Sequence, residues 1–64
     1  MIYVAKIRNG RVELYNAANG SYQRSVGSSN AISANVQGDT VAITYANGKV
    51  EIYKCSTGAY QRSL

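Results

Sequence analysis

The last eighteen residues of the chain repeat a segment that lies thirty-eight positions earlier. Residues 47–64 and residues 9–26 are identical at ten of their eighteen paired positions. A period near forty residues, built from short strands, is typical of stacked or ringed units that bury their apolar faces against one another. The repeat therefore constrains the architecture strongly, whereas it says little about what the protein does.

The runs between the turns alternate apolar and polar residues with a period of two, which predicts an all-β protein of antiparallel strands. Asn9-Gly10 and Asn47-Gly48 are each expected to close a two-residue hairpin turn with positive φ at both central residues. That register would bury Val12, Leu14, Val50 and Ile52. Seven strands are predicted, at residues 2–7, 11–15, 21–26, 31–37, 40–45, 49–53 and 59–64.

The chain is expected to form a single domain over residues 1–64. Repeat one, residues 1–26, supplies three strands, and repeat two, residues 27–64, supplies four. The repeat aligns the first strand with the fifth, so that Val41, Ile43 and Tyr45 correspond to Tyr3, Ala5 and Ile7.

A domain of 64 residues buries only about 60 % of the surface of its unfolded chain, so we expect it to need additional stabilisation. A single cysteine, Cys55, allows no disulfide within the chain, and the absence of histidine and the presence of only three carboxylates disfavour a structural metal. We therefore expect a homo-oligomer, a dimer or a trimer. A small seven-stranded meander or barrel formed by one chain stays open as the alternative.

Residues 31–64 contain, in order, Gly38-Asp39, Val41-Ala42-Ile43-Thr44, the stretch from Asn47 to Tyr53, and Thr57-Gly58-Ala59-Tyr60. This order resembles one four-stranded β-propeller blade of the WD40-like and quinoprotein-like families, and also small bacteriophage and prophage proteins. The resemblance implies a ring of four to eight blades completed by several chains. The Trp-Asp and Gly-His signatures of WD40 repeats are missing, and no quinone-binding residue can be carried over, so no cofactor is expected.

Few residues could support catalysis. The chain has no histidine, and its only carboxylate pair, Glu13 and Glu51, occupies equivalent positions of the repeat that need not converge. Cys55 occupies the position that Ala17 has in the first copy, which disfavours a nucleophile or ligand role. We expect a non-enzymatic structural or binding module, of phage or prophage origin if the resemblance holds.

The repeated Tyr-Gln-Arg-Ser segment is the candidate binding surface. A tyrosine and an arginine two residues apart on a strand are expected to share a face, where they could stack on a base or sugar ring or bind a phosphate. The same residues could equally decorate an edge strand or form a subunit contact. The candidate binding residues are Tyr22, Gln23, Arg24, Tyr60, Gln61 and Arg62.

Two alternative functions follow from this surface. One is a nucleic-acid-binding module, in which Lys6, Arg8, Arg11 and Lys49 would add positive charge. The other is a lectin-like ring with sugar pockets between repeats. Nucleic-acid binding should weaken steeply with ionic strength, whereas sugar binding should hardly change.

The chain is basic, with a net charge of +4, but no two basic residues are adjacent. This dispersed charge is typical of a soluble cationic surface. The sequence starts without a signal-peptide pattern, and no apolar run is long enough to span a membrane. We expect a cytoplasmic protein, or a virion-associated one if it derives from a phage.

Overall fold

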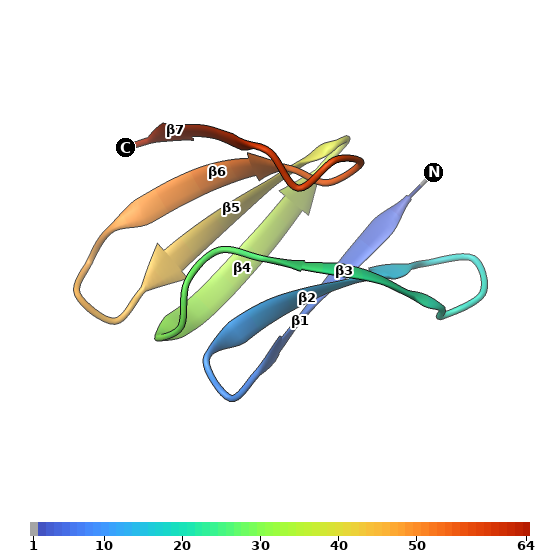
Figure 1. Cartoon of the computed structure of the whole chain (residues 1–64), viewed down its shortest axis with the longest axis horizontal. Coiled ribbons are helices and arrows are strands. Elements are labelled where there is room, and N and C mark those ends of the chain that lie inside the picture. Colours follow the sequence, from blue (N-terminus) through green and yellow to red (C-terminus); the bar gives the residue numbers. More distant parts are fainter. Residues whose placement is uncertain (1) are drawn as a thin grey trace.

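The computed structural model describes residues 2–64 and confirms an all-β fold of seven antiparallel strands (Figure 1). The strands form two separate sheets. Sheet 1 has the order β1-β2-β3 and sheet 2 the order β4-β5-β6-β7. The strands are β1 (Tyr3–Arg8), β2 (Arg11–Asn16), β3 (Tyr22–Val26), β4 (Ala31–Gln37), β5 (Thr40–Tyr45), β6 (Val50–Lys54) and β7 (Tyr60–Ser63).

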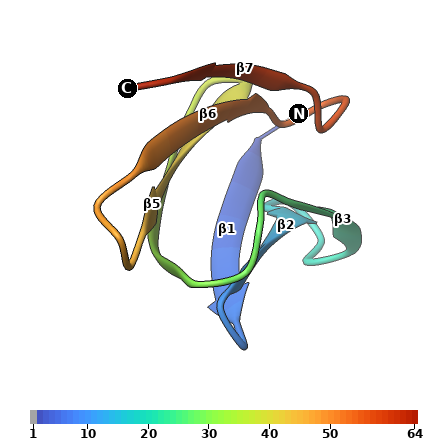
Figure 2. The same cartoon turned by 60° about the vertical axis from the view of Figure 1, so that its left-hand side comes forward.

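Each sheet is a simple meander in which consecutive strands are neighbours. Within the described residues, no strand of sheet 1 pairs with a strand of sheet 2, so the chain does not close into a single barrel. Figure 2 shows the two sheets as distinct layers that face one another. The element following Val26 is a short connection in which Gly27 and Asn30 both have positive φ, at 78° and 75°, and it leads the chain from one sheet to the other.

The first hairpin turn has the predicted form. Asn9 and Gly10 have φ values of 53° and 77°, and Arg8 pairs with Arg11 across them. Two successive positive φ values match the right-handed twist of the flanking strands, and Asn-Gly adopts them at little cost. Ile7 then pairs with Val12 and Ala5 with Leu14, which places these four side chains on the same face of sheet 1.

The prediction for the second hairpin turn is wrong. Only Gly48 has a positive φ, of 89°, and the Tyr45 N–H donates to Lys49 O at 2.8 Å, so that Ala46, Asn47 and Gly48 form a three-residue loop. Such loops commonly place a glycine in the left-handed region at their third position. The Asn47 side chain accepts a hydrogen bond from the Lys49 N–H at 3.0 Å, which stabilises this alternative.

The extra loop residue changes which β5 and β6 side chains share a face. Ile43 pairs with Glu51 and Ala42 with Ile52, whereas the first copy would have paired Ile43 with Ile52. A one-residue change of register moves every side chain of a strand to the opposite face relative to its partner. Val50 and Ile52 are therefore only half-buried, contrary to the expectation that they would lie in the core.

The extra loop residue also changes the expected alignment of the first strand with the fifth. The Ala17 N–H donates to Ile2 O, and the equivalent Cys55 N–H donates to Asp39 O, thirty-seven positions later rather than thirty-eight. Val4 thus corresponds to Val41, and Lys6 to Ile43. From the hairpin turns onward, the spacing of thirty-eight holds through β2 and β6 and through β3 and β7.

The core lies between the two sheets. Its largest fully buried side chains come from β2 and β5, because the faces that carry them are covered by the opposite sheet. Burying one such aliphatic side chain contributes roughly 1.5–3 kcal/mol. Ile32 on β4 is 62 % exposed, because the β4–β5 pairing is irregular between Ala31 and Ser33. The buried residues are Tyr3, Val12, Leu14, Val26, Ala31, Val41, Ile43, Tyr45 and Cys55.

Gly48→Val is expected to lower the melting temperature by about 4–8 °C. Gly48 has a φ of 89°, which costs a β-branched residue about 1 kcal/mol or more, while a Cβ atom there would contact no other described residue within 4 Å. Thermal unfolding followed by circular dichroism measures the effect, with Gly48→Asn as the control because asparagine tolerates this region. Equal melting temperatures for the valine variant and the wild type would contradict the turn.

Candidate functional site

The first Tyr-Gln-Arg-Ser segment does not form the predicted surface. Tyr22 pairs with Tyr15 and Arg24 pairs with Leu14, and a β-bulge at Gln23 separates the two pairs. Because Leu14 and Tyr15 are consecutive on β2, their side chains point to opposite faces, and so do those of Tyr22 and Arg24. The expectation that this tyrosine and arginine share a face is therefore wrong.

The second segment repeats this geometry. Tyr60 pairs with Tyr53 and Arg62 pairs with Ile52, with the bulge at Gln61. Tyr60 is 53 % exposed, and Arg62 is exposed on the opposite face of the sheet. The six candidate binding residues are thus divided between both faces of both sheets rather than brought together.

The tyrosines of the segments pack on a repeated Glu-x-Tyr element, which the alternation of apolar and polar residues does not reveal as a unit. Tyr15 donates to Glu13 Oε1 at 2.9 Å, and its ring lies edge-on to that of Tyr22, with centroids 5.7 Å apart. Glu51, Tyr53 and Tyr60 repeat the arrangement, at 3.0 Å and 5.5 Å. The hydrogen bond to Glu13 raises the pKa of Tyr15, while burial, followed by the hydrogen bond to Glu51, raises the pKa of Tyr53.

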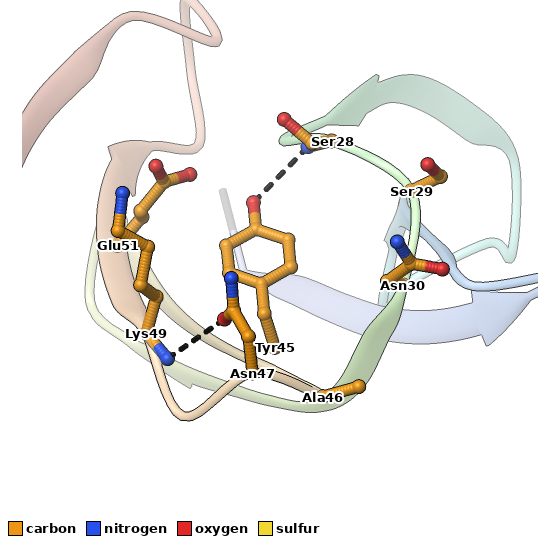
Figure 3. Close-up of a pocket in the computed structure, with 8 residues that line it drawn as sticks. All are labelled: Ser28, Ser29, Asn30, Tyr45, Ala46, Asn47, Lys49 and Glu51. Carbon is orange, nitrogen blue, oxygen red and sulfur yellow. Dashed lines mark hydrogen bonds between the residues drawn. The ribbon is translucent and has the colours of Figure 1, made fainter.

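A polar pocket of about 380 Å³ lies where the connection between the repeats meets the second hairpin turn (Figure 3). Tyr45 forms part of its wall, and its hydroxyl oxygen accepts a hydrogen bond from the Ser28 N–H at 3.0 Å. Burial raises the pKa of Tyr45, so the phenol stays protonated near neutral pH. The lining residues are Ser28, Ser29, Asn30, Tyr45, Ala46, Asn47, Lys49 and Glu51.

Lys49 and Glu51 give this pocket one cationic and one anionic side chain, and Ser28, Ser29 and Asn30 surround them with hydrogen-bonding groups. The close-up shows Lys49 and Glu51 on one wall and the serines on the other (Figure 3). Such a pocket can accommodate a small polar molecule. The sequence does not predict this pocket, because its two walls come from segments that only the packing of the sheets brings together.

The environment of Cys55 differs from that of Ala17, its equivalent in the repeat. It is fully buried and belongs to the core, whereas its repeat equivalent, Ala17, is exposed. Burial raises the pKa of the Cys55 thiol and keeps it in the protonated form, which is the less nucleophilic one.

Cys55→Ser is therefore expected to destabilise the fold by about 1–3 kcal/mol, because a hydroxyl would replace a thiol in an apolar site. The repeat alone, in which Ala17 occupies the equivalent position, would instead predict that the substitution is neutral. Urea denaturation measures the loss, and Ala17→Ser is the matched control at the exposed equivalent. Identical midpoints for Cys55→Ser and the wild type would contradict the burial of this side chain.

Each sheet has two faces of different character. We call the face of sheet 1 formed by Val12, Leu14, Arg24 and Val26 its aliphatic face, and the face formed by Val4, Lys6, Glu13, Tyr15 and Tyr22 its tyrosine face. In sheet 2, the aliphatic face consists of Val50, Ile52, Arg62 and Leu64. Its tyrosine face consists of Val41, Ile43, Glu51, Tyr53 and Tyr60.

The two sheets pack with the aliphatic face of sheet 1 on the tyrosine face of sheet 2. Val12, Leu14 and Val26 belong to the same buried cluster as Val41 and Ile43, and Tyr53 packs against that cluster. A Cβ atom at Gly58 would lie 3.4 Å from Arg24 Cδ and 3.7 Å from Val26 Cγ1. Within residues 2–64, nothing covers the other two faces, one on each sheet.

The whole chain, residues 1–64, matches the family described as the Helicobacter pylori IceA2 protein. The chain belongs to the IceA2 family. No curated protein matches this IceA2-family chain. The match corrects the assignment suggested by the resemblance to WD40-like and quinoprotein-like blades and to phage proteins, because the matching family is bacterial. Short strands, Asn-Gly turns and repeated tyrosines are common to many β-repeat proteins, so those motifs do not distinguish their families.

Two further observations concern residues 2–64 of this IceA2-family chain. No helix in that range is long and apolar enough to cross a membrane. The same residues contain no group of three or more histidine, cysteine, aspartate or glutamate side chains placed to hold a metal ion.

Proposed function

We propose that this IceA2-family protein is a non-enzymatic module that acts by self-association, as a cyclic homo-oligomer such as a dimer or trimer. The observation that supports this is the presence of two uncovered sheet faces whose repeat equivalents are both covered inside the chain. An apolar face that is buried in one copy of a repeat and exposed in the other is typical of a unit that needs another neighbour.

The exposed fractions of equivalent side chains support the proposal. Val26 is 4 % exposed in sheet 1, whereas Leu64, its equivalent in sheet 2, is 79 % exposed. Val41 is fully buried in sheet 2, whereas Val4 in sheet 1 is 50 % exposed. Covering these side chains would add apolar burial that a chain of 64 residues otherwise lacks.

Ring closure is part of the proposal. Each chain contributes two sheets, so a dimer would join four sheets and a trimer six. Closed rings satisfy every repeated face with a finite number of chains, whereas an open stack always leaves two faces uncovered. The binding function of such a ring would reside in surfaces that assembly creates or repeats, among them the pocket lined by Tyr45 and Glu51.

The mass of the native particle tests the proposal. Native mass spectrometry and sedimentation equilibrium at micromolar concentration should give a single integer multiple of the 6.9 kDa chain. A folded particle with the mass of one chain would reject self-association. A ladder of masses that grows with concentration would reject the closed ring.

A further inference from the structure

We infer that the chains join head to tail, with the aliphatic face of sheet 2 in one chain lying on the tyrosine face of sheet 1 in the next. This inference rests on the proposed self-association and specifies the two surfaces that make it. The partner is a second copy of this chain, because the contact would repeat the one that already joins the two sheets internally.

The aliphatic face of sheet 2 has the same backbone framework as the covered face of sheet 1. The β6–β7 pairings of Ile52 with Arg62 and of Tyr53 with Tyr60 reproduce the β2–β3 pairings thirty-eight positions earlier, including the bulge. The Leu64 N–H donates to Val50 O at 2.9 Å, which continues the pairing to the end of β7. Its side chains can therefore project as those of sheet 1 do.

The tyrosine face of sheet 1 has a shallow apolar hollow where the corresponding part of sheet 2 is filled. A pocket of about 350 Å³ is lined by Val4, Lys6, Tyr15, Asn16, Ala17 and Gly20. The repeat equivalent of Gly20 is Gly58, which Arg24 and Val26 approach to within van der Waals distance. A Cβ atom at Gly20 would have none of the described residues 2–64 within 4 Å.

The repeat specifies what fills this hollow. Arg24 and Val26 of β3 are the side chains that approach Gly58, and their equivalents thirty-eight positions later are Arg62 and Leu64. In the assembly, Arg62 and Leu64 of a second copy lie against Gly20. Both side chains are exposed in the single chain, which leaves them free to make this contact.

The contact between chains differs from the internal one in polarity. Lys6 stands where the tyrosine face of sheet 2 has Ile43, and Arg8 stands where it has Tyr45. The aliphatic part of a lysine side chain can cover apolar surface while its charge stays in water. The contact between chains is thus weaker than the internal contact, so chains separate on dilution before the sheets do.

Two single variants break opposite ends of the contact. Leu64→Asp places a carboxylate on the aliphatic face of sheet 2, and Val4→Asp places one on the tyrosine face of sheet 1. Both side chains are at least half exposed, so the charge is tolerated in the single chain. Each purified variant should sediment as a monomer. Ala17→Asp, in an exposed loop that lines the same hollow, replaces Val4→Asp if the latter loses its β-sheet circular dichroism.

Mixing the two variants gives the deciding measurement. Leu64→Asp chains retain an intact tyrosine face, and Val4→Asp chains retain an intact aliphatic face, so an equimolar mixture should form a one-to-one dimer with twice the mass of the 6.9 kDa chain. No larger species should form, because the dimer ends in two blocked faces. Ile32→Asp is the control, since Ile32 is 62 % exposed on β4, a strand without an equivalent in sheet 1, and this variant should keep the wild-type mass.

The masses of the wild type and the variants test the head-to-tail contact and self-association separately. An oligomeric wild type whose Leu64→Asp or Val4→Asp variant stays fully assembled would overturn the head-to-tail contact and leave self-association intact. A mixture that stays monomeric would overturn it as well, because the intact tyrosine face of one variant would then fail to bind the intact aliphatic face of the other. A monomeric wild type would overturn both.

Discussion

Leu14→Ala should cost about 2–5 kcal/mol of folding free energy, which is about half of the stability of a protein of this size. Leu14 is fully buried at the centre of β2, between the two sheets, and truncating such a side chain loses its burial and leaves a cavity. A chain of 64 residues has a total stability of about 3–10 kcal/mol. We expect the ratio of unfolded to folded chains to rise by about 30-fold or more.

Urea denaturation followed by circular dichroism measures this effect, and the repeat supplies a matched control. Ile52 occupies the equivalent position on β6 but is only half-buried in the single chain. Both alanine substitutions should be compared in the Leu64→Asp background, where assembly does not contribute. Ile52→Ala should then lose less than half as much stability as Leu14→Ala. Equal losses would contradict the unequal burial of the two copies.

Gly27→Ala is expected to destabilise the fold by about 3 kcal/mol. Gly27 has a φ of 78°, which costs an alanine about 1–2 kcal/mol. Its Cβ atom would lie 2.5 Å from the Tyr45 hydroxyl oxygen and 3.0 Å from Ile43 Cδ1, so the core has to shift. The shift also strains the hydrogen bond from the Ser28 N–H to Tyr45, whose loss adds about 1 kcal/mol.

Gly38→Ala is the control for the backbone contribution alone. Gly38 also has a positive φ, of 60°, but a Cβ atom there would meet none of the other residues that the structure describes within 4 Å. The difference between the melting temperatures of the two variants reports the contact with Tyr45. Ser28 amide exchange, followed by NMR, should accelerate in Gly27→Ala and stay unchanged in Gly38→Ala. Equal melting temperatures would show that Tyr45 does not pack against Gly27.

The strands and their order could be predicted from the sequence because they depend on local patterns. Period-two alternation and turn residues determined all seven strands, and Asn9-Gly10 determined the first hairpin turn. The second Asn-Gly pair was misleading because a three-residue loop and a two-residue turn both accommodate a glycine with positive φ at their last position. Whether Ala46 belongs to the strand or to the loop depends on which face of β5 the other sheet covers.

The candidate site could not be predicted in the same way. Identical letters in Tyr22-Gln23-Arg24 and Tyr60-Gln61-Arg62 indicated two equivalent surfaces, but a bulge is invisible to an alternation pattern and reverses the faces of the residues that follow it. The sequence also does not show which of two equivalent side chains is buried. Ala17 and Cys55 have the same place in the repeat, and only the position of the neighbouring sheet makes one exposed and the other part of the core.

The three-residue loop at Ala46 also bears on how two such similar hairpins avoid exchanging strands. Because β2 and β6 are similar in sequence, β1 could pair with β6 during folding, as strands of neighbouring repeats do when they misassemble. If β1 kept the register that it has with β2, Ala5 and Ile7 would share a face with Val50 and Ile52 in this hybrid hairpin. Glu51 and Tyr53 would then share a face with Lys6 instead of Ile43. The additional loop residue, Ala46, thus gives the two hairpins different registers. A hairpin formed from β1 and β6 would not bury the side chains that form the core in the native pairing.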